Sequence, residues 1–316
     1  MRKIVKALVA ALGLSVSASV ALAQDWAPPG PVKLLIAFGA GGGADTQARL
    51  IAAALEERFG WEFVPQQVTG KGGLNMLTAL SKEPADGTAI GMAVTETLGY
   101  NLLVGKTDLK PGDFTGLSTT AGFQLAIVGQ TEDGWETMHD TIKAAKGGKE
   151  IRVGVMSPRI ADLVYLMEKE HGVKFNTVPY KGGKLVLDAI VAGDVDVGFV
   201  AGPQAKGVAA GDLVELASAM NVPLNLTPDA PLLSDLGVDF HATGQFVFIA
   251  PGGLAPEGQK AFGDAIEAVV TDPDQKVSQI ITRVFGGPMV VKGADLDARL
   301  QSDYAASIEL LKAVEE

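Results

Sequence analysis

The chain of 316 residues carries a formal net charge of −11 at pH 7, is 47% hydrophobic and contains no cysteine. This acidic balance argues against nucleic acid and anionic membrane surfaces as partners. Without cysteine we expect neither a disulfide nor a lipoprotein anchor, so a core of ordinary size must hold the fold together. The length suits two domains of roughly 100–200 residues each.

The first residues have the pattern of a secretory signal peptide. Arg2, Lys3 and Lys6 precede an apolar stretch at 7–22, and an A-x-A cleavage site ends at Ala23. A membrane anchor is the alternative, but a glycine and three serines interrupt the apolar stretch. Cleavage takes away three basic residues and no acidic one, which lowers the net charge from −11 to −14. No later segment is apolar enough to cross a bilayer, so we expect a periplasmic protein without a membrane anchor.

Residues 32–45, VKLLIAFGAGGGAD, predict a buried strand, a glycine loop and the start of a helix. The first N–H groups of such a helix have no partner of their own and lie at the positive end of its dipole. Because glycine lets a ligand approach the backbone closely, this loop is a candidate anion site. Asp45 is expected to serve as the N-cap rather than as a ligand contact.

Part of this segment, residues 39–44, also fits the sequence motif of dinucleotide-binding loops. Gly39, Gly41 and Ala44 match G-x-G-x-x-A, which is weak evidence when it stands alone, and a glycine-rich turn without a ligand is the other alternative. A nicotinamide enzyme also needs an acidic residue at the end of the second strand, where Gln66 and Gln67 stand instead. Export to a compartment without a nicotinamide pool argues against it as well.

The strand–loop–helix unit recurs and predicts an α/β fold with parallel sheets. Further strands are expected at 61–68, 88–94, 124–128, 151–156, 173–178, 195–200 and 245–250. Helices are expected at 74–83, 135–145, 158–171, 184–192, 256–271, 273–285 and 295–314. Ser157 followed by Pro158 is a strong helix start, and Gly172 is a helix end.

Short polar linkers near 119–122 and 221–229 divide the chain into two units. The middle segment, 123–224, predicts one α/β domain inserted into another that comprises 24–122 and 225–316. Two discontinuous domains joined by two crossings are typical of a hinged binding protein.

Four loops are expected at the carboxyl ends of strands, the edge where open α/β sheets bind ligands. They lie at 38–45, 70–73, 157–161 and 180–183. Lys71, Arg159 and Lys181 place a base in three of them, which favours an anionic ligand, and Ser157 offers a hydroxyl. The alternatives are solvated loop charges and a plain N-cap, and Tyr180 either packs on a ligand or covers the sheet edge.

Catalytic and metal-binding patterns are poor. His139, His171 and His241 have no Ser or acid partner by motif, and neither G-x-S-x-G nor H-E-x-x-H occurs. Asp194 and Asp196 have a spacing that a metal could use, but a turn and a solvated strand edge are favoured. We therefore expect no catalytic residues, no metal and no cofactor.

Nine segments occur together and in order: Pro31-Val32, Phe38 with Gly41-Gly42-Gly43 and Asp45, Arg49-Leu50, Gly70-Lys71-Gly72-Gly73, Asp86-Gly87-Thr88, Ser157-Pro158, Val178 to Gly183, Gly193 to Asp196, and Ala250 to Gly253. In this combination the chain resembles the periplasmic solute-binding receptors of tripartite tricarboxylate transporters, called Bug or TctC-like proteins. The resemblance implies a type II periplasmic-binding-protein fold, with two Rossmann-like domains, a hinge and a central cleft that closes on a small carboxylate. It further implies a monomer without enzymatic activity that delivers this organic acid anion to membrane permease subunits.

The resemblance also implies ligand contacts from both domains. Those of the first domain would be Phe38, Gly41, Gly42, Gly43, Ala44, Asp45, Lys71, Gly72, Gly73 and Thr95. Those of the second would be Ser157, Arg159, Pro179, Tyr180, Lys181, Ala201 and Gly202.

The chain departs from the family pattern at several positions. Ala37 and Ala40 stand where the family usually has proline, and Arg159 stands where it commonly has glycine. A cation at a helix N-terminus on the cleft edge leads to the hypothesis that Arg159 contacts a second carboxylate and favours a dicarboxylate. An exported enzyme on the same fold, and a chemosensory module that docks a sensor domain, are the alternative functions.

Overall fold

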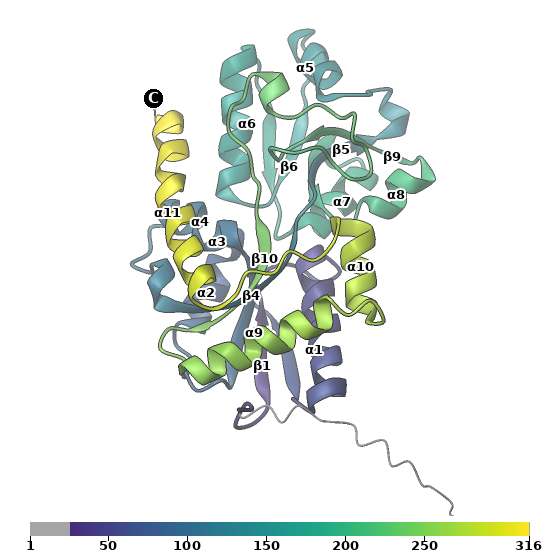
Figure 1. Cartoon of the computed structure of the whole chain (residues 1–316). Coiled ribbons are helices and arrows are strands. Elements are labelled where there is room, and N and C mark those ends of the chain that lie inside the picture. The colour runs from purple at the N-terminus through teal and green to yellow at the C-terminus, as the bar shows by residue number, and fades with distance from the viewer. Residues whose placement is uncertain (1–25, 316) are drawn as a thin grey trace, which may run out of the picture.

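The computed structural model describes residues 26–315, so the predicted signal peptide lies outside the described residues. These residues form two lobes, each built around a five-stranded sheet (Figure 1). Within this range, no helix combines the length and the apolar character needed to cross a membrane.

The first sheet has the strand order β2-β1-β3-β10-β4. Its strands are β1 (Val32–Ile36), β2 (Phe63–Gln67), β3 (Ala89–Val94), β4 (Phe114–Gly122) and β10 (Gln245–Pro251). β1 pairs in parallel with β2 and β3, whereas β10 runs antiparallel to β3 and β4. β3 and β10 are nearly continuous apolar runs because helices cover them and both of their faces are buried.

The second sheet has the order β7-β6-β8-β5-β9. Its strands are β5 (Leu125–Gln130), β6 (Arg152–Val155), β7 (Asn176–Pro179), β8 (Val197–Ala201) and β9 (Leu213–Ser218). β6 pairs in parallel with β7 and β8, and β5 runs antiparallel to β8 and β9. Both sheets thus share one plan, in which the reversed strand is the one that enters from the other lobe.

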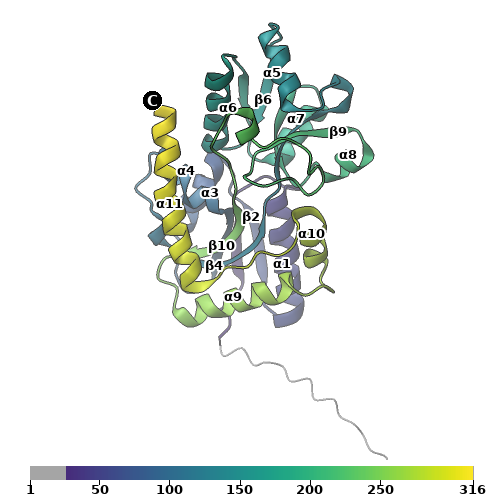
Figure 2. The same cartoon turned by 45° about the horizontal axis from the view of Figure 1, so that its top comes forward.

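Helices fill the connections between the strands. They are α1 (Gly43–Phe59), α2 (Leu74–Leu80), α3 (Thr95–Leu98), α4 (Tyr100–Val104), α5 (Met138–Lys146), α6 (Pro158–His171), α7 (Gly183–Val191), α8 (Ala205–Ala210), α9 (Pro256–Val270), α10 (Lys276–Phe285) and α11 (Gly293–Glu315). A short 3₁₀ turn, Lys71–Gly73, precedes α2. In both views α11 lies beside α3 and α4 and extends from the first lobe towards α6 of the second (Figures 1 and 2).

The chain crosses between the lobes twice. The first crossing joins β4 to β5 through Phe123, and the second enters β10 through Gly244. The N–H of Phe123 donates to the carbonyl of Gly244 at 3.1 Å, so the two crossing segments lie side by side. A Cβ on Gly244 would lie 2.6 Å from the Phe123 ring, which explains why glycine stands there.

Residues 225–242 pack on the second lobe before the chain returns. The N–H of Ala242 donates to the carbonyl of Ala219 at 2.7 Å, and Nε2 of His171 lies 2.8 Å from the carbonyl of Leu236. We therefore propose that the second domain extends to about Ala242, beyond its predicted end.

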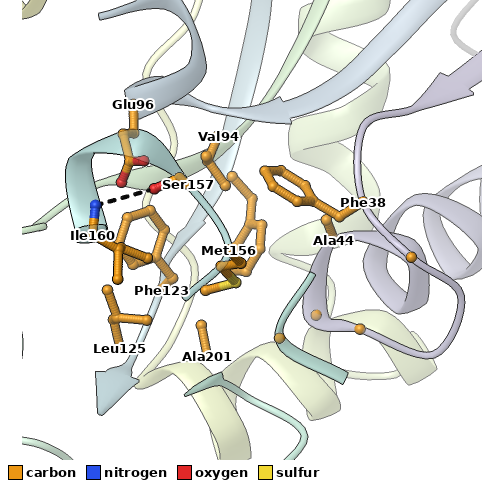
Figure 3. A pocket seen from close by; sticks show the side chains of 15 residues that line it. Phe38, Ala44, Val94, Glu96, Phe123, Leu125, Met156, Ser157, Ile160 and Ala201 are labelled. Atoms are coloured by element: carbon orange, nitrogen blue, oxygen red, sulfur yellow. Dashed lines mark hydrogen bonds between the residues drawn. The ribbon is translucent and has the colours of Figure 1, made fainter. Parts of the chain in front are cut away.

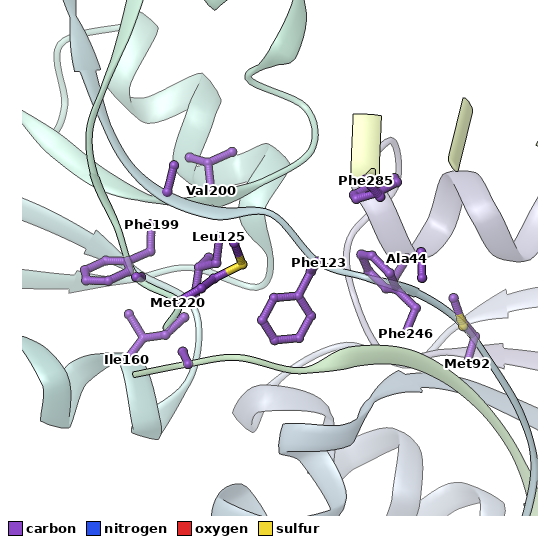
Figure 4. Packing of buried hydrophobic residues seen from close by; sticks show 14 of the residues in the cluster. Ala44, Met92, Phe123, Leu125, Ile160, Phe199, Val200, Met220, Phe246 and Phe285 are labelled. Atoms are coloured by element: carbon purple, nitrogen blue, oxygen red, sulfur yellow. The ribbon is translucent and has the colours of Figure 1, made fainter. Parts of the chain in front are cut away.

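Three aromatic rings connect the cores of the two lobes. Phe123 and Phe246 lie 6.0 Å apart between ring centroids, and Phe246 and Phe285 lie 5.1 Å apart, in edge-to-face geometry (Figure 4). The hydrophobic cluster that contains them continues into both sheets. The cores of the two lobes are therefore continuous through the region of the crossings.

Two sequence predictions about the fold are wrong. The sheets are not all-parallel, because β5 and β10 enter their sheets from the opposite lobe and run against their neighbours. The predicted linker at 119–122 is the end of β4, whose hydroxyl residues are buried and satisfy backbone groups; Oγ1 of Thr119 donates to the carbonyl of Met289 at 2.7 Å.

Candidate functional site

A cavity lies between the lobes, next to both crossings (Figure 3). The empty space between its walls is about 560 Å³, its open mouth included. The walls consist of Phe38, Gly39, Gly42, Gly43, Ala44, Val94, Glu96, Phe123, Leu125, Met156, Ser157, Ile160, Gly183, Ala201 and Phe246. Most of these side chains are apolar, so the cavity suits a small ligand with a hydrocarbon or aromatic body and few polar groups.

The glycine loop brings the N-terminus of α1 to the wall. The N–H of Thr46 closes the first helical turn on the carbonyl of Gly42 at 2.9 Å, so the N–H groups of Gly43 and Ala44 precede the intrahelical ladder. These N–H groups and the positive end of the helix dipole can receive an anion without any cationic side chain.

The prediction that Asp45 is the N-cap is wrong, because Gly42 holds that position. Asp45 is buried in the first turn, and its carboxylate accepts from the N–H of Gly41 (2.9 Å), Nε of Arg49 (2.8 Å) and Nε2 of Gln67 (2.9 Å). The bond from Gly41 fixes the glycine loop, and those from Arg49 and Gln67 fix the carboxylate, so Asp45 supports the loop.

The second lobe supplies two more helix starts. Ser157 is the N-cap of α6, as predicted, and its Oγ accepts from the N–H of Ile160 at 3.4 Å. α7 begins at Gly183, and the N–H of Val186 closes its first turn on the carbonyl of Gly182 at 3.2 Å. Because Gly183 lines the cavity, the N-termini of α1 and α7 meet the same space from opposite lobes.

Backbone contacts close the lobes at this edge. The N–H of Gly39 donates to the carbonyl of Lys181 at 3.2 Å. Gly182 has a φ of 152°, and a Cβ there would lie 3.1 Å from the nitrogen of Gly39. A Cβ on Gly43 would lie 3.0 Å from the carbonyl oxygen of Ala201. The glycines are thus needed for the close approach of the two loops.

Six of the predicted site residues line the cavity: Phe38, Gly42, Gly43, Ala44, Ser157 and Ala201. The other predicted residues lie outside its walls: Gly41, Asp45, Lys71, Gly72, Gly73, Thr95, Arg159, Pro179, Tyr180, Lys181 and Gly202. Lys71 and Lys181 are exposed, and Lys181 takes part in the contact between the lobes through its backbone carbonyl. None of the three predicted bases therefore reaches the cavity.

Arg159 lines a second, polar cavity instead, together with Arg299 and Asp303 of α11. Its guanidinium donates to the carbonyl of His241. Burial raises the pKa of Asp303, although the charges of Arg299 and Arg159 oppose this shift. The pKa of His241 is lowered, mainly by burial and to a smaller extent by the charge of Arg159. The observed side-chain position therefore does not support a contact between Arg159 and a second carboxylate in the first cavity.

Three further wall residues, Gly39, Ile160 and Gly183, lie in the loops that were predicted to line the cleft, whereas six were not predicted: Val94, Glu96, Phe123, Leu125, Met156 and Phe246. Phe123 and Phe246 stand at the two crossings, and a large aromatic residue at each crossing was the signal that could have pointed to them. Glu96 had no such signal, because its position depends on how α3 packs against β10 and α11, which are distant in the sequence.

No cluster of acidic and histidine side chains in residues 26–315 could hold a metal ion. Asp196, one of the two weighed carboxylates, is bound to Arg152, whose backbone N–H donates at 2.7 Å and whose guanidinium donates at 3.0 and 3.1 Å. This carboxylate has the turn and strand-edge role that was favoured.

Two sheets of identical strand plan, two crossings and a cavity between the lobes are the architecture of the periplasmic-binding-protein fold. The chain is similar to the solved structure of the periplasmic binding protein BugD, with a TM-score of 0.81 at 19% identity over 92% of this chain and 99% of that one. It is also similar to a structure described as Rpa4515 of R. palustris with adipate, with a TM-score of 0.77 at 22% identity over 91% and 98% of the chains. These likenesses confirm the type II fold.

The family follows from the sequence itself. Residues 47–286 match the family described as "Tripartite tricarboxylate transporter family receptor", TctC, and this match covers more than half of the chain. The protein BugT of Bordetella pertussis is 26% identical over 272 residues, which cover 79% of this chain and 80% of BugT. The chain belongs to the TctC family of solute-binding receptors, as the resemblance predicted.

Proposed function

We propose that the protein is a periplasmic receptor that captures a small organic acid between its lobes and delivers it to the membrane subunits of a tripartite tricarboxylate-type transporter. One observation carries the proposal: the N-termini of α1 and α7 converge on an apolar cavity from opposite lobes. A carboxylate bound there would bridge the lobes and favour their closure, because it gains N–H donors from both only when they are closed.

Family membership supports the receptor role, and the solved structure described with adipate supports an organic acid as the ligand class. The apolar walls argue for a ligand whose body is hydrocarbon or aromatic. Since no predicted base reaches the cavity, we propose that backbone N–H groups and dipoles, rather than ion pairs, hold the carboxylate.

The proposal is tested by identifying what the protein carries. The protein is purified gently from the periplasm of expressing cells and denatured, and the released molecules are analysed by mass spectrometry. We expect one small organic acid in near-stoichiometric amount. Release of a nucleotide or a peptide, or of no acid from a protein that also fails to bind any in a thermal-shift screen, would contradict the proposal.

Two further measurements separate the receptor from its alternatives. The recovered acid is incubated with the purified protein, and we expect it back unchanged, whereas conversion would show an exported enzyme. Membrane vesicles that contain the transporter subunits should take up the labelled acid only when the protein is added. Uptake without it, combined with ligand-dependent capture of a sensor domain, would favour a chemosensory module.

A further inference from the structure

A buried carboxylate, Glu96, forms part of the wall of the interlobe cavity. Glu96 is the second residue of α3 and is only 6% exposed. Its carboxylate points across the lobe boundary towards Ser157 (Figure 3). An acidic side chain is an unexpected wall residue in a cavity whose helix N-termini suit an anion.

The hydrogen bonds of Glu96 are incomplete. Oε1 accepts from Nδ2 of Asn101 at 3.2 Å, and the same Nδ2 donates to the carbonyl of Gly72 at 3.0 Å. Within residues 26–315, Oε2 has no hydrogen-bond partner, and neither Arg159 nor Arg299, which line the second cavity behind Glu96, forms an ion pair with it. Oε2 is not among the fully buried oxygens, because Glu96 borders the cavity space, so a donor of a ligand can take the place of the water that hydrates it.

Glu96 and the start of α1 lie at different ends of the cavity. Figure 3 shows Glu96 on one side and Ala44 with Phe38 on the other, with Val94 and Met156 between them. The α1 end thus offers N–H donors, whereas the other end adds the carboxylate of Glu96 as an acceptor beside the start of α6, and apolar side chains separate the two ends. A ligand that satisfies both ends carries an acceptor at one end and a donor at the other.

We propose that the cavity selects a monocarboxylate whose opposite end bears an N–H donor, an ammonium or an amide, and that Glu96 accepts from this donor. The inference rests on the proposed function and names its ligand class. A dicarboxylate of the same length would place its second carboxylate against Glu96, where the low dielectric of a buried site strengthens like-charge repulsion. Glu96 would therefore act both as an attractive contact for the donor and as a repulsive one for dicarboxylates.

The experiment compares ligands of equal length by calorimetry on the protein freed of its own ligand. The six-carbon series is hexanoate, adipate, 6-aminohexanoate and adipamate, and a four-carbon series (butanoate, succinate, 4-aminobutanoate and succinamate) guards against a length mismatch. We expect the ammonium or the amide compound to bind at least about tenfold more tightly than the alkanoate and the dicarboxylate. The comparison of ammonium with amide decides which donor the site takes.

Glu96→Gln is the variant that assigns the preference to this side chain. Glutamine keeps an oxygen for Asn101, so the variant retains the one observed hydrogen bond. We expect it to lose most of the preference for the ammonium compound and to bind the dicarboxylate more tightly than the wild type does. Glu215→Gln is the matched control, because Glu215 is also buried, with 3% of its surface exposed, and also accepts from a side-chain amide, that of Gln204 at 2.9 Å. Glu215 lies outside the cavity, so this variant should leave the ligand preference unchanged.

The outcomes separate this inference from the function on which it rests. If the wild type binds the alkanoate or the dicarboxylate as tightly as the donor-bearing acids, the receptor proposal stands and the role of Glu96 is wrong. Tighter binding of the dicarboxylate by the wild type than by Glu96→Gln would also overturn the inference, since Glu96 would then donate rather than accept. If the folded wild type binds no acid of either series and releases no organic acid on denaturation, both proposals fail.

Discussion

A hydrogen bond between the lobes offers a direct test of the closing mechanism. Tyr100, at the start of α4 in the first lobe, is fully buried, and its hydroxyl donates to Oδ2 of Asp162 in α6 of the second lobe at 2.6 Å. Burial is the main cause that raises the pKa of Tyr100, and the hydrogen bond to Asp162 raises it further. The phenol therefore keeps its proton and donates throughout the neutral pH range. Tyr100→Phe removes this donor while it keeps the ring that packs between the helices.

The size of the effect follows from the chemistry of the pair. A hydrogen bond to a charged group contributes about 1.5–3 kcal/mol, and the lower value applies here because Asp162 is only partly buried. If the bond forms only when the lobes close, the whole of about 1.5 kcal/mol is lost from the closed state, and the Kd for the acid rises about tenfold.

The assay is calorimetry with the acid recovered from the protein, paired with urea unfolding of the unliganded form. Asp162→Asn is the control, because the amide oxygen still accepts from Tyr100, and it should weaken binding less than Tyr100→Phe does. A Tyr100→Phe variant that unfolds more easily but keeps the wild-type Kd within about twofold would refute the reasoning, since the bond would then persist in the open form.

Three other substitutions test the site and its support. Gly43→Ala should raise the Kd for the acid, measured by calorimetry, about tenfold to a hundredfold, because the new Cβ would lie 3.0 Å from a carbonyl oxygen across the cleft. Gly30→Ala is the control and should leave the Kd unchanged, because a Cβ at this position would have no atom within 4 Å. Asp45→Ala should lower the free energy of unfolding in urea by about 1–3 kcal/mol and weaken binding, since three donors lose their acceptor; unchanged values would contradict the role given to this carboxylate. Burial opposes ionisation of Asp196, but the hydrogen bonds and charge of Arg152 outweigh it and hold the pKa of Asp196 below its ordinary value. Asp196→Asn should therefore cost about 1–2 kcal/mol at pH 7, and this deficit should shrink as the pH falls below about 3.9 towards the depressed pKa, as urea unfolding at several pH values would show.

The parts of the site that local chemistry determines were predictable from the sequence. The strand, the glycine loop and the helix predicted at 32–45 are all present, although the helix begins two residues earlier, at Gly43, than Asp45 would suggest. They were predictable because an apolar run, the backbone freedom of glycine and helical periodicity all act within a few residues. Ser157 caps α6 for the same reason, since the N-cap and the proline after it are adjacent in the chain. The starts of α1, α6 and α7, which reach the cavity, all belong to loops that the sequence singled out.

What depends on distant contacts was not predictable. β4 reads FTGLSTTAG, which resembles a polar linker, yet it becomes a buried strand because hydroxyls such as that of Thr119 bond to backbone groups about 170 residues away. By its place in the sequence Arg159 was expected to bind an anion, but its guanidinium donates a hydrogen bond to the backbone carbonyl of His241 instead. A single sequence does not show which partner a long side chain will find.

The central claim is that helix N-termini from both lobes hold the carboxylate of the ligand. A crystal structure of the protein with the acid that it releases tests this claim most directly. The account predicts carboxylate oxygens within about 2.7–3.2 Å of the backbone nitrogen of Gly43 or Ala44 in one lobe and of Gly183 in the other. A carboxylate bound to the guanidinium of Arg159 in the second cavity, with the start of α1 left without an anion, would contradict it.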